Sequence, residues 1–289
     1  MKNLSLPPDL SAYLQSKYNI TDAVIVKGGS INEAAKIYSK TGTYFIKWNE
    51  FFIPDFFESE VKNLQLIKQQ QVFSTPEIVE VGYTEDTAFL MLDYIESSRP
   101  SYTSMRQFGE KLAQFHSIKQ AHFGLNFNNY CGLIFQTNVV TKNWTDFFVE
   151  YRLRPLVNRA FNQQLLYLSE VEIFVKLFEK FSDYFPKENP ALLHGDLWSG
   201  NFITTQNQDV TLIDPACYFG HRELDLAMTS LFGGFDRTFY EAYEANYPLV
   251  AGWKDRVALW NIYPLLIHLI LFGDGYRPQL VHNLSRIAA

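Results

Sequence analysis

The sequence predicts an α+β protein with a small β-rich N-terminal lobe, residues 1–95, and a larger α-helical C-terminal lobe, residues 96–289. Short apolar runs separated by turn residues fill most of the first hundred positions, as in a sheet. From about residue 104 onward, apolar residues recur at helical spacing instead. With 289 residues, of which 47% are hydrophobic, the chain is long enough to bury a substantial core.

The N-terminal lobe is expected to consist of strands and one helix. Turns are predicted at Lys27-Gly28-Gly29-Ser30 and at Thr41-Gly42, and the chain should pass between the lobes near residues 93–98. The strands are expected at 23–26, 34–38, 43–48, 78–81 and 88–92, and the helix at 58–70.

The C-terminal lobe is expected to be mainly helical. Phe108, Leu112 and Phe115 repeat at positions i, i+4 and i+7, which is typical of one helix face. Further helical patterns cover 144–156, 171–181 and the region from residue 223 to the end, and two short hairpins are expected between 191 and 214.

Composition excludes several functional classes. The formal charge is −6 without a basic block, so no nucleic-acid partner is expected. Two cysteines are too few for a disulfide framework and favour a reduced, cytoplasmic location. The N-terminus does not resemble a signal peptide, and the longest apolar run, Ile262–Phe272, is about half a membrane span. We therefore expect no membrane association, and a monomer or weak dimer.

The run "HGDLWSGN" carries the strongest chemical signal. Asp196 and Asn201 are separated by four residues between two apolar runs, and Asp214 follows the next apolar run. Phosphoryl transfer needs one carboxylate to accept a proton, with an amide and a second carboxylate to hold Mg²⁺. The spacing matches the catalytic loop of kinases, with His-Gly-Asp in place of His-Arg-Asp. A polar turn is the alternative for any one of these residues, but the joint pattern favours catalysis.

A kinase-like site also requires a lysine on an upstream strand and a glutamate on a helix. Strand alternation places Lys47 on the same face as Phe45, although an exposed lysine on an edge strand is the alternative. Glu60 lies within the apolar stripe of the next helix, where a carboxylate needs a cation. Glu58 is a competing partner but lies off that stripe. The stripe is formed by Phe56, Phe57, Leu64 and Ile67.

Two further segments are candidates for ATP contacts. Gly28, Gly29 and Ser30 would allow a phosphate to approach the backbone, although a plain hairpin turn explains them equally well. The segment that joins the lobes, Asp93-Tyr94-Ile95, is expected to meet adenine through its backbone.

Together, "LLHGDLWSGN", "IDPACYFGHRELDLAM" and "SLFGGF" resemble the fructosamine kinase family, also called ketosamine-3-kinases. This family has a protein-kinase-like fold, shared with aminoglycoside phosphotransferases and choline kinases. The resemblance implies ATP-dependent phosphorylation of the 3-hydroxyl of ketosamines. These adducts form between sugars and amines, including protein lysines, and the 3-phosphate then leaves by elimination, so such a kinase repairs glycation.

The resemblance assigns a role to each matching residue. Asp196 would be the base and Trp198 would stack on the sugar, although a core tryptophan is the alternative. His268 would lie near the substrate or be a core histidine. The remaining assignments are Asn201 and Asp214 as Mg²⁺ ligands, Lys47 and Glu60 as the pair that positions phosphate, and His194 and Asp225 as structural support of the catalytic loop.

Two positions depart from the family pattern. Ser30 stands where many members have a cysteine, so the resemblance does not imply a disulfide-linked dimer through that turn. Asn138-Val139-Val140 replaces the usual Asn-Gly-Trp and leaves one side of the substrate pocket open to question. A kinase of the same fold acting on an aminoglycoside, choline or a similar metabolite is the alternative function. A catalytically dead pseudokinase is the third, but every expected polar position is present.

Overall fold

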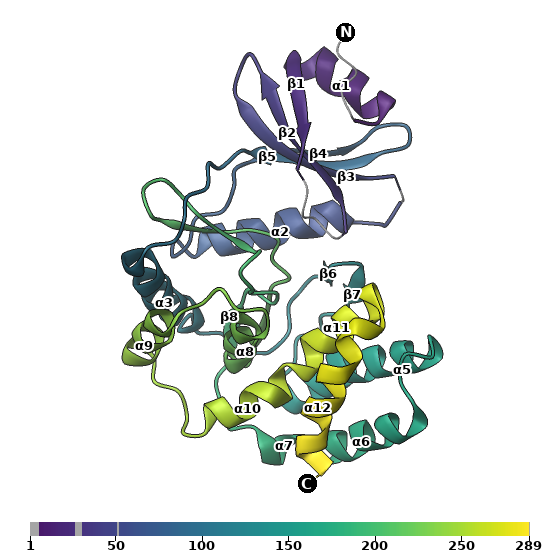
Figure 1. The fold of residues 1–289 in the computed structure, drawn as a ribbon, viewed down its shortest axis with the longest axis vertical. Helices are drawn as coiled ribbons and strands as arrows, with labels where there is room; N and C mark the ends of the chain where they lie inside the picture. The colour runs from purple at the N-terminus through teal and green to yellow at the C-terminus, as the bar shows by residue number, and fades with distance from the viewer. Residues whose placement is uncertain (1–5, 27–30, 51, 289) are drawn as a thin grey trace. The chain divides into compact units, whose positions relative to one another are not determined.

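The computed structural model describes residues 6–26, 31–50 and 52–288, which form two compact units. The first unit contains the residues up to Ser98 together with Ile203–Ile213. The second contains Arg99–Phe202 and the residues from Asp214 onward. The first holds an antiparallel sheet and the second is mostly helical (Figure 1), so the predicted α+β class is confirmed.

The first unit is built on a five-stranded sheet with the order β1-β2-β3-β5-β4, in which every neighbouring pair is antiparallel. Each predicted strand is present, with ends that differ by a few residues. The strands are β1 (Ile20–Ile25), β2 (Glu33–Ser39), β3 (Thr43–Asn49), β4 (Ile78–Tyr83) and β5 (Ala88–Asp93), and the predicted helix is α2 (Phe56–Gln69).

A helix that was not predicted, α1 (Pro8–Tyr18), precedes the sheet. Leu10 and Leu14 are the buried residues of α1, and they join the core that contains Ile46 and Trp48 of β3. With few buried apolar positions, the helical periodicity of this segment is weak, which explains why the prediction failed.

Strand alternation separates the two sides of β3. Ile46 and Trp48 point into the α1 core, whereas Lys47 points to the other face and meets α2 through Glu60. The first unit therefore has one helix against each face of its sheet.

The hairpin of β9 (Phe202–Thr204) and β10 (Val210–Leu212) largely belongs to the first unit. The Ser98 backbone N–H donates to the Thr204 carbonyl at 2.7 Å, and the Leu212 N–H donates to the Ser74 carbonyl at 3.0 Å. The predicted boundary at residue 95 assigned all later residues to the C-terminal lobe, whereas Ile203–Ile213 belong to the first unit. The predicted pairing was also wrong in one respect, because β8 (Ala191–Leu193) pairs with β11 (Tyr218–Gly220) rather than with β9.

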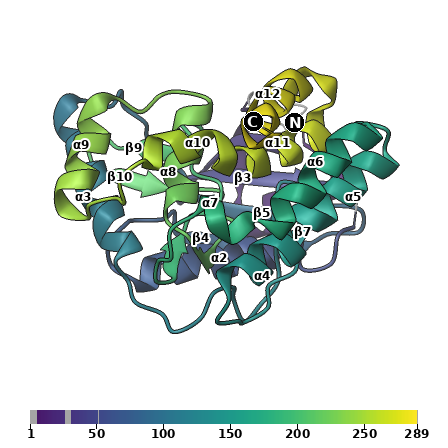
Figure 2. The ribbon, with the colours of Figure 1, turned by 90° about the horizontal axis from the view of Figure 1, so that it is seen from below.

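The second unit contains the helices that carry the rest of the chain. Helices α3 and α9 lie side by side in both views (Figures 1 and 2), with the rings of Phe108 and Phe239 5.2 Å apart. This unit also contains a small hairpin that was not predicted, formed by β6 (Asn129–Cys131) and β7 (Ile134–Gln136). The helices are α3 (Tyr102–His116), α4 (Trp144–Phe148), the π-helix η1 (Val149–Leu153), α5 (Arg154–Asn162), α6 (Leu168–Glu179), α7 (Phe181–Tyr184), α8 (Glu223–Leu231), α9 (Arg237–Asn246), α10 (Trp253–Trp260), α11 (Ile262–Phe272), the 3₁₀-helix η2 (Asp274–Tyr276) and α12 (Arg277–Ala288).

The helical stretch Trp253–Phe272, which spans α10 and α11, is the only one in the described ranges that is long and apolar enough to cross a membrane. Its mean hydropathy is 1.3, and half of its apolar window is buried. A core helix has the same properties, so this is weak evidence for a membrane span.

Candidate active site

Asp196 and Asn201 lie in the loop that follows β8, and a side-chain hydrogen bond joins them. The Asn201 Nδ2 atom donates to Asp196 Oδ2 at 2.8 Å and to the Asp196 backbone carbonyl at 2.8 Å. Because both donors of the amide point to Asp196, the Oδ1 atom of Asn201 is left as an acceptor on the other side of the amide. The loop therefore orients one amide oxygen away from Asp196.

Asp225 of α8 supports this loop by accepting backbone hydrogen bonds from it. Its carboxylate, which is 1% exposed, accepts the backbone N–H of His194 at 2.7 Å and that of Gly195 at 3.0 Å. These are the hydrogen bonds expected of a residue that supports the loop. The His194 Nδ1 atom in turn accepts the backbone N–H of Asp196 at 3.3 Å.

Gly195 is required at its position for two reasons. Its φ angle is +83°, which disfavours side chains, and a Cβ atom would lie 2.0 Å from the Ala216 carbonyl oxygen. The loop backbone is therefore packed directly against the segment that follows Asp214, so Asp196 has little freedom to move.

The carboxyl group of Asp196 has an unusual pKa. Burial, which is the largest cause, and the carboxylates of Asp214 and Asp225 together raise this pKa to about 7, against the opposing effect of the Asn201 hydrogen bond. A carboxylate whose pKa lies near neutral pH is suited to accept a proton from a hydroxyl group.

Asp214 follows β10 and has an exposed side chain with a φ angle of +52°, a conformation that aspartate tolerates better than most residues. It lies close enough to Asp196 to raise the pKa of that residue. Asp214 offers carboxylate oxygens, and Asn201 offers its oriented Oδ1 atom. Oxygen donors of this kind are the ligands that Mg²⁺ prefers, so the donor set fits the predicted ion.

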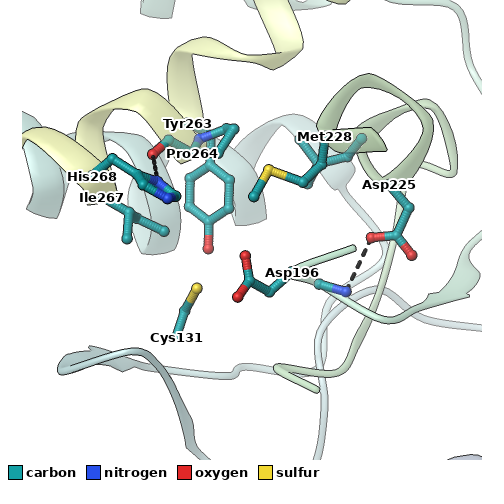
Figure 3. Close-up of a pocket in the computed structure, with 10 residues that line it drawn as sticks. Cys131, Asp196, Asp225, Met228, Tyr263, Pro264, Ile267 and His268 are labelled. Atoms are coloured by element: carbon teal, nitrogen blue, oxygen red, sulfur yellow. Dashed lines mark hydrogen bonds between the residues drawn. The ribbon is translucent and has the colours of Figure 1, made fainter. Parts of the chain in front are cut away.

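Asp196 faces a small pocket in the second unit, lined by residues of β6, α8 and α11 (Figure 3). Figure 3 shows the Tyr263 hydroxyl pointing toward the Asp196 carboxylate and the Cys131 thiol. Gln136 Nε2 donates to that hydroxyl, so the Tyr263 proton is available for another acceptor. The pocket is lined by Cys131, Gly195, Asp196, Leu224, Asp225, Met228, Tyr263, Pro264, Ile267 and His268.

His268 lines this pocket, as expected for a residue near the substrate. Its Nδ1 atom lies 2.8 Å from the Pro264 carbonyl, which can only accept, so Nδ1 carries the proton and Nε2 is an acceptor (Figure 3). Burial lowers the pKa of His268 below its ordinary value, so the ring is neutral near pH 7.

Trp198 does not line the pocket directly. Its indole lies over Gly200, where a Cβ atom would be 2.3 Å from the ring, and contacts the ring of Phe232 at 5.8 Å. Phe232 contacts His268 at 4.8 Å. Trp198 is therefore linked to the pocket through one intervening aromatic ring.

In the first unit, Lys47 and Glu60 form the predicted ion pair. The Lys47 Nζ atom is 2.5 Å from Glu60 Oε2, and the two side chains are 8% and 13% exposed. Glu58, the competing partner, instead accepts a hydrogen bond from the Tyr83 hydroxyl at 3.0 Å.

In the predicted adenine-binding segment, two of the three backbone N–H groups already donate hydrogen bonds within the first unit. The backbone N–H of Asp93 donates to Glu77 and that of Tyr94 donates to Thr43. Of these three residues, Ile95 is the one whose backbone N–H donates no backbone hydrogen bond within the described residues. The predicted phosphate-covering turn, Gly28, Gly29 and Ser30, lies outside the described residues.

Several pocket residues escaped the sequence analysis. Cys131 lies in the hairpin that was missed, and no local pattern marks it. Tyr263 could have been found, because Tyr263 and Ile267 are four residues apart on one helix and His268 adjoins them. Leu224 and Met228 share the same i, i+4 relation on α8.

Comparison with known proteins shows which family the chain belongs to. The fructosamine kinase family model matches residues 6–289. A protein from Vibrio parahaemolyticus named probable ketoamine kinase is 35% identical over 98% of both chains, and one of the same name from Lactiplantibacillus plantarum is 36% identical over 88% of this chain and 90% of its own.

Solved structures extend the comparison to the fold. A protein from Haemophilus somnus assigned as a fructosamine-3-kinase superposes with a TM-score of 0.88 at 28% identity, and 97% of each chain is covered. The aminoglycoside phosphotransferase APH(4)-Ia has a TM-score of 0.64 at 14% identity over 97% of this chain and 96% of its own, which shows a shared kinase-like fold alone. The chain therefore has a kinase-like fold, is a phosphotransferase and belongs to the fructosamine kinase family.

Proposed function

We propose that this protein transfers the terminal phosphoryl group of ATP to the 3-hydroxyl of a ketosamine, the adduct of a sugar with an amine. The observation that carries this proposal is the position of Asp196. It faces a pocket that is also lined by the polar side chains of Tyr263 and His268, and its pKa of about 7 suits a base. Family membership supports the class of substrate.

In the proposed reaction, Asp196 accepts the proton of the 3-hydroxyl as its oxygen attacks the phosphorus atom. Asn201 and Asp214 would hold Mg²⁺, which neutralises charge on the phosphates when bound. The Lys47–Glu60 pair would hold the ammonium against the α- and β-phosphates, and the backbone of Ile95 would meet adenine.

On the sugar side, the neutral ring of His268 would accept a hydrogen bond from a substrate hydroxyl through Nε2. The Tyr263 hydroxyl would donate to another substrate oxygen, since Gln136 already donates to it. Elimination of the 3-phosphate from the product, followed by hydrolysis of the C1–N bond by water, would release the amine, which makes the reaction a repair of glycation. Cys131 and Cys217 are buried and form no disulfide, consistent with a cytoplasmic enzyme.

The test is ATP-coupled turnover on ribulosamine, fructosamine and aminoglycoside substrates side by side. We expect turnover with one or both ketosamines, none with the aminoglycoside, and a phosphate on O3 of the product by NMR. Turnover of the aminoglycoside, choline or a similar metabolite in place of the ketosamines would favour the alternative kinase of the same fold.

A further inference from the structure

Five aromatic side chains form a continuous cluster beside the pocket, here called the aromatic rim. Its members come from four separate segments, namely the catalytic loop, the residue after α8, α11 and η2. His268 is central, with its ring 4.8 Å from Phe232, 5.5 Å from Phe272 and 5.0 Å from Tyr276. Trp198 joins at the far side through Phe232.

The rim is both exposed and connected to the site. Phe232 is 36% exposed and Phe272 is 41% exposed, whereas aromatic rings normally gain more from burial. His268 lines the pocket that Asp196 faces and also contacts three other rings of the rim, so the rim adjoins the pocket. A ligand that extends beyond the pocket would therefore meet aromatic rings.

The chemistry of these rings favours a cation. The faces of aromatic rings carry negative potential and attract ammonium groups within about 6 Å. A charged histidine at the centre would repel a cation, but burial lowers the pKa of His268 and keeps this ring neutral near pH 7. Among the described residues, no lysine or arginine lies over any of these five rings.

The proposed substrate carries a cation close to its reacting hydroxyl. In a ketosamine the amine nitrogen is bonded to C1 and the reacting hydroxyl to C3, so four bonds separate the nitrogen from the reacting oxygen, or roughly 4–5 Å. A secondary alkyl amine is protonated at neutral pH. The amine and its substituent must leave the pocket on one side when the 3-hydroxyl is at Asp196.

We propose that the aromatic rim, through Phe232, Phe272 and Tyr276, binds the protonated amine of the ketosamine and the first carbons of its substituent. This inference rests on the proposed function and specifies how the amine half of the substrate is recognised. It predicts that the enzyme distinguishes ketosamines from neutral ketoses by charge.

The test uses two probes that differ in one atom: a fructosamine with a butylamine substituent, and the ether in which oxygen replaces the nitrogen. KM and kcat are measured for both probes with wild type, Phe272→Leu, Tyr276→Leu and Phe272→Trp. Leucine keeps an apolar side chain but removes the ring, whereas tryptophan keeps a ring. Phe161→Leu is the matched control, because Phe161 is 42% exposed in the same unit and has no ring contact with the rim among the described residues.

We expect wild type to have the lower KM for the amine. Each leucine variant should raise that KM about 3- to 10-fold, as expected for loss of one cation–π contact, with kcat within about twofold. The KM for the ether should stay unchanged, and Phe272→Trp and Phe161→Leu should resemble wild type. Melting temperatures check that each variant is folded.

Equal increases of KM for both probes would overturn the proposal, because the rim would then act only as an apolar surface. Unchanged KM in both leucine variants would overturn it as well, because the rim would not touch the substrate. Absence of turnover by wild type with either probe is a different result, which would remove the proposed function itself and the rim proposal with it.

Discussion

Glu60 in the first unit and Asp196 in the second are both carboxylates among largely buried side chains, but their surroundings differ in charge. Glu60 lies 2.5 Å from the ammonium of Lys47. Asp196 has no cationic partner among the described residues. Its neighbours are the Asn201 amide and two further carboxylates, and its pKa is about 7. The negative charge of Glu60 is balanced by Lys47 without any ligand, whereas no cation of the protein balances a charge on Asp196 among the described residues.

This difference separates two ways of building a site. The Lys47–Glu60 pair is complete in itself, so its role is to hold an ammonium in one place. Asp196 is kept in an unfavourable environment by a braced backbone, which raises its affinity for a proton. Strain of this kind reduces the stability of the folded protein and is retained where function requires it.

The largest expected effect is on turnover when Asp196 becomes neutral. Asp196→Asn should lower kcat about 10³-fold, because an amide cannot accept the proton of the substrate. Binding of ATP, measured by calorimetry, should remain within about threefold. Asp183→Asn, an exposed aspartate of the same unit, is the control and should resemble wild type. Equal turnover in Asp196→Asn and wild type would show that Asp196 is not the base.

Removing the cation of the first unit should affect both stability and activity. Lys47→Met removes the cation beside the largely buried Glu60 carboxylate, so the free energy of unfolding should fall by about 1–3 kcal/mol. The double variant Lys47→Met/Glu60→Gln should regain that stability but not the activity, which we expect to fall on the order of 10²-fold with a higher KM for ATP.

The control for this experiment is the exposed pair Lys68–Glu77, whose side chains are 52% and 61% exposed. Lys68→Met should change stability by less than about 1 kcal/mol and leave KM for ATP unchanged. If Lys47→Met alters stability alone, the lysine is structural and does not bind phosphate.

Asp225 should influence Asp196 through the loop that it supports. Asp225→Asn replaces one acceptor oxygen by a donor, so one of the two backbone hydrogen bonds is lost and kcat should fall about tenfold. Loss of a nearby negative charge also lowers the pKa of Asp196, so the acidic limb of the pH–rate profile should move to lower pH. An unshifted profile with a changed KM would contradict the positioning role.

The smallest expected effect concerns the pocket hydroxyl. Tyr263→Phe removes one hydrogen bond to the substrate and should raise KM for the ketosamine about 3- to 10-fold, with little change in KM for ATP. Tyr240→Phe is the control, since the Tyr240 hydroxyl is paired with Thr229 at 2.9 Å and does not line the pocket. Identical kinetics of the two variants would exclude Tyr263 from substrate binding.

The ion pair of Glu60 with Lys47 was predictable from local periodicity in the sequence. Alternation along β3 places Lys47 on one face, and the 3.6-residue repeat of α2 places Glu60 in the stripe that meets it. The catalytic loop was predictable for a different reason. Asp196 and Asn201 are close in sequence, so their contact depends little on the rest of the chain.

Long-range packing limited the remaining predictions. The pairing of β8 with β11 and the return of β9 and β10 to the first unit depend on partners far along the chain. Cys131 and Tyr263 approach Asp196 only after the second unit has packed. No local pattern contains that information, so the contact between Asp196 and Asn201 was easier to predict than the walls of the pocket.

The most direct test of the contrast between the two carboxylates is the pH dependence of stability without metal or nucleotide. The folded pKa of Asp196, about 7, lies above its ordinary value of 3.8, so the folded state binds more protons between these limits. Stability should therefore fall as pH rises from about 4 to 7, by on the order of 3 kcal/mol for this group. Denaturant unfolding of wild type and Asp196→Asn over this range measures the effect. We expect Asp196→Asn to lack this loss and to be the more stable protein at pH 7, whereas parallel profiles would contradict an uncompensated Asp196 carboxylate.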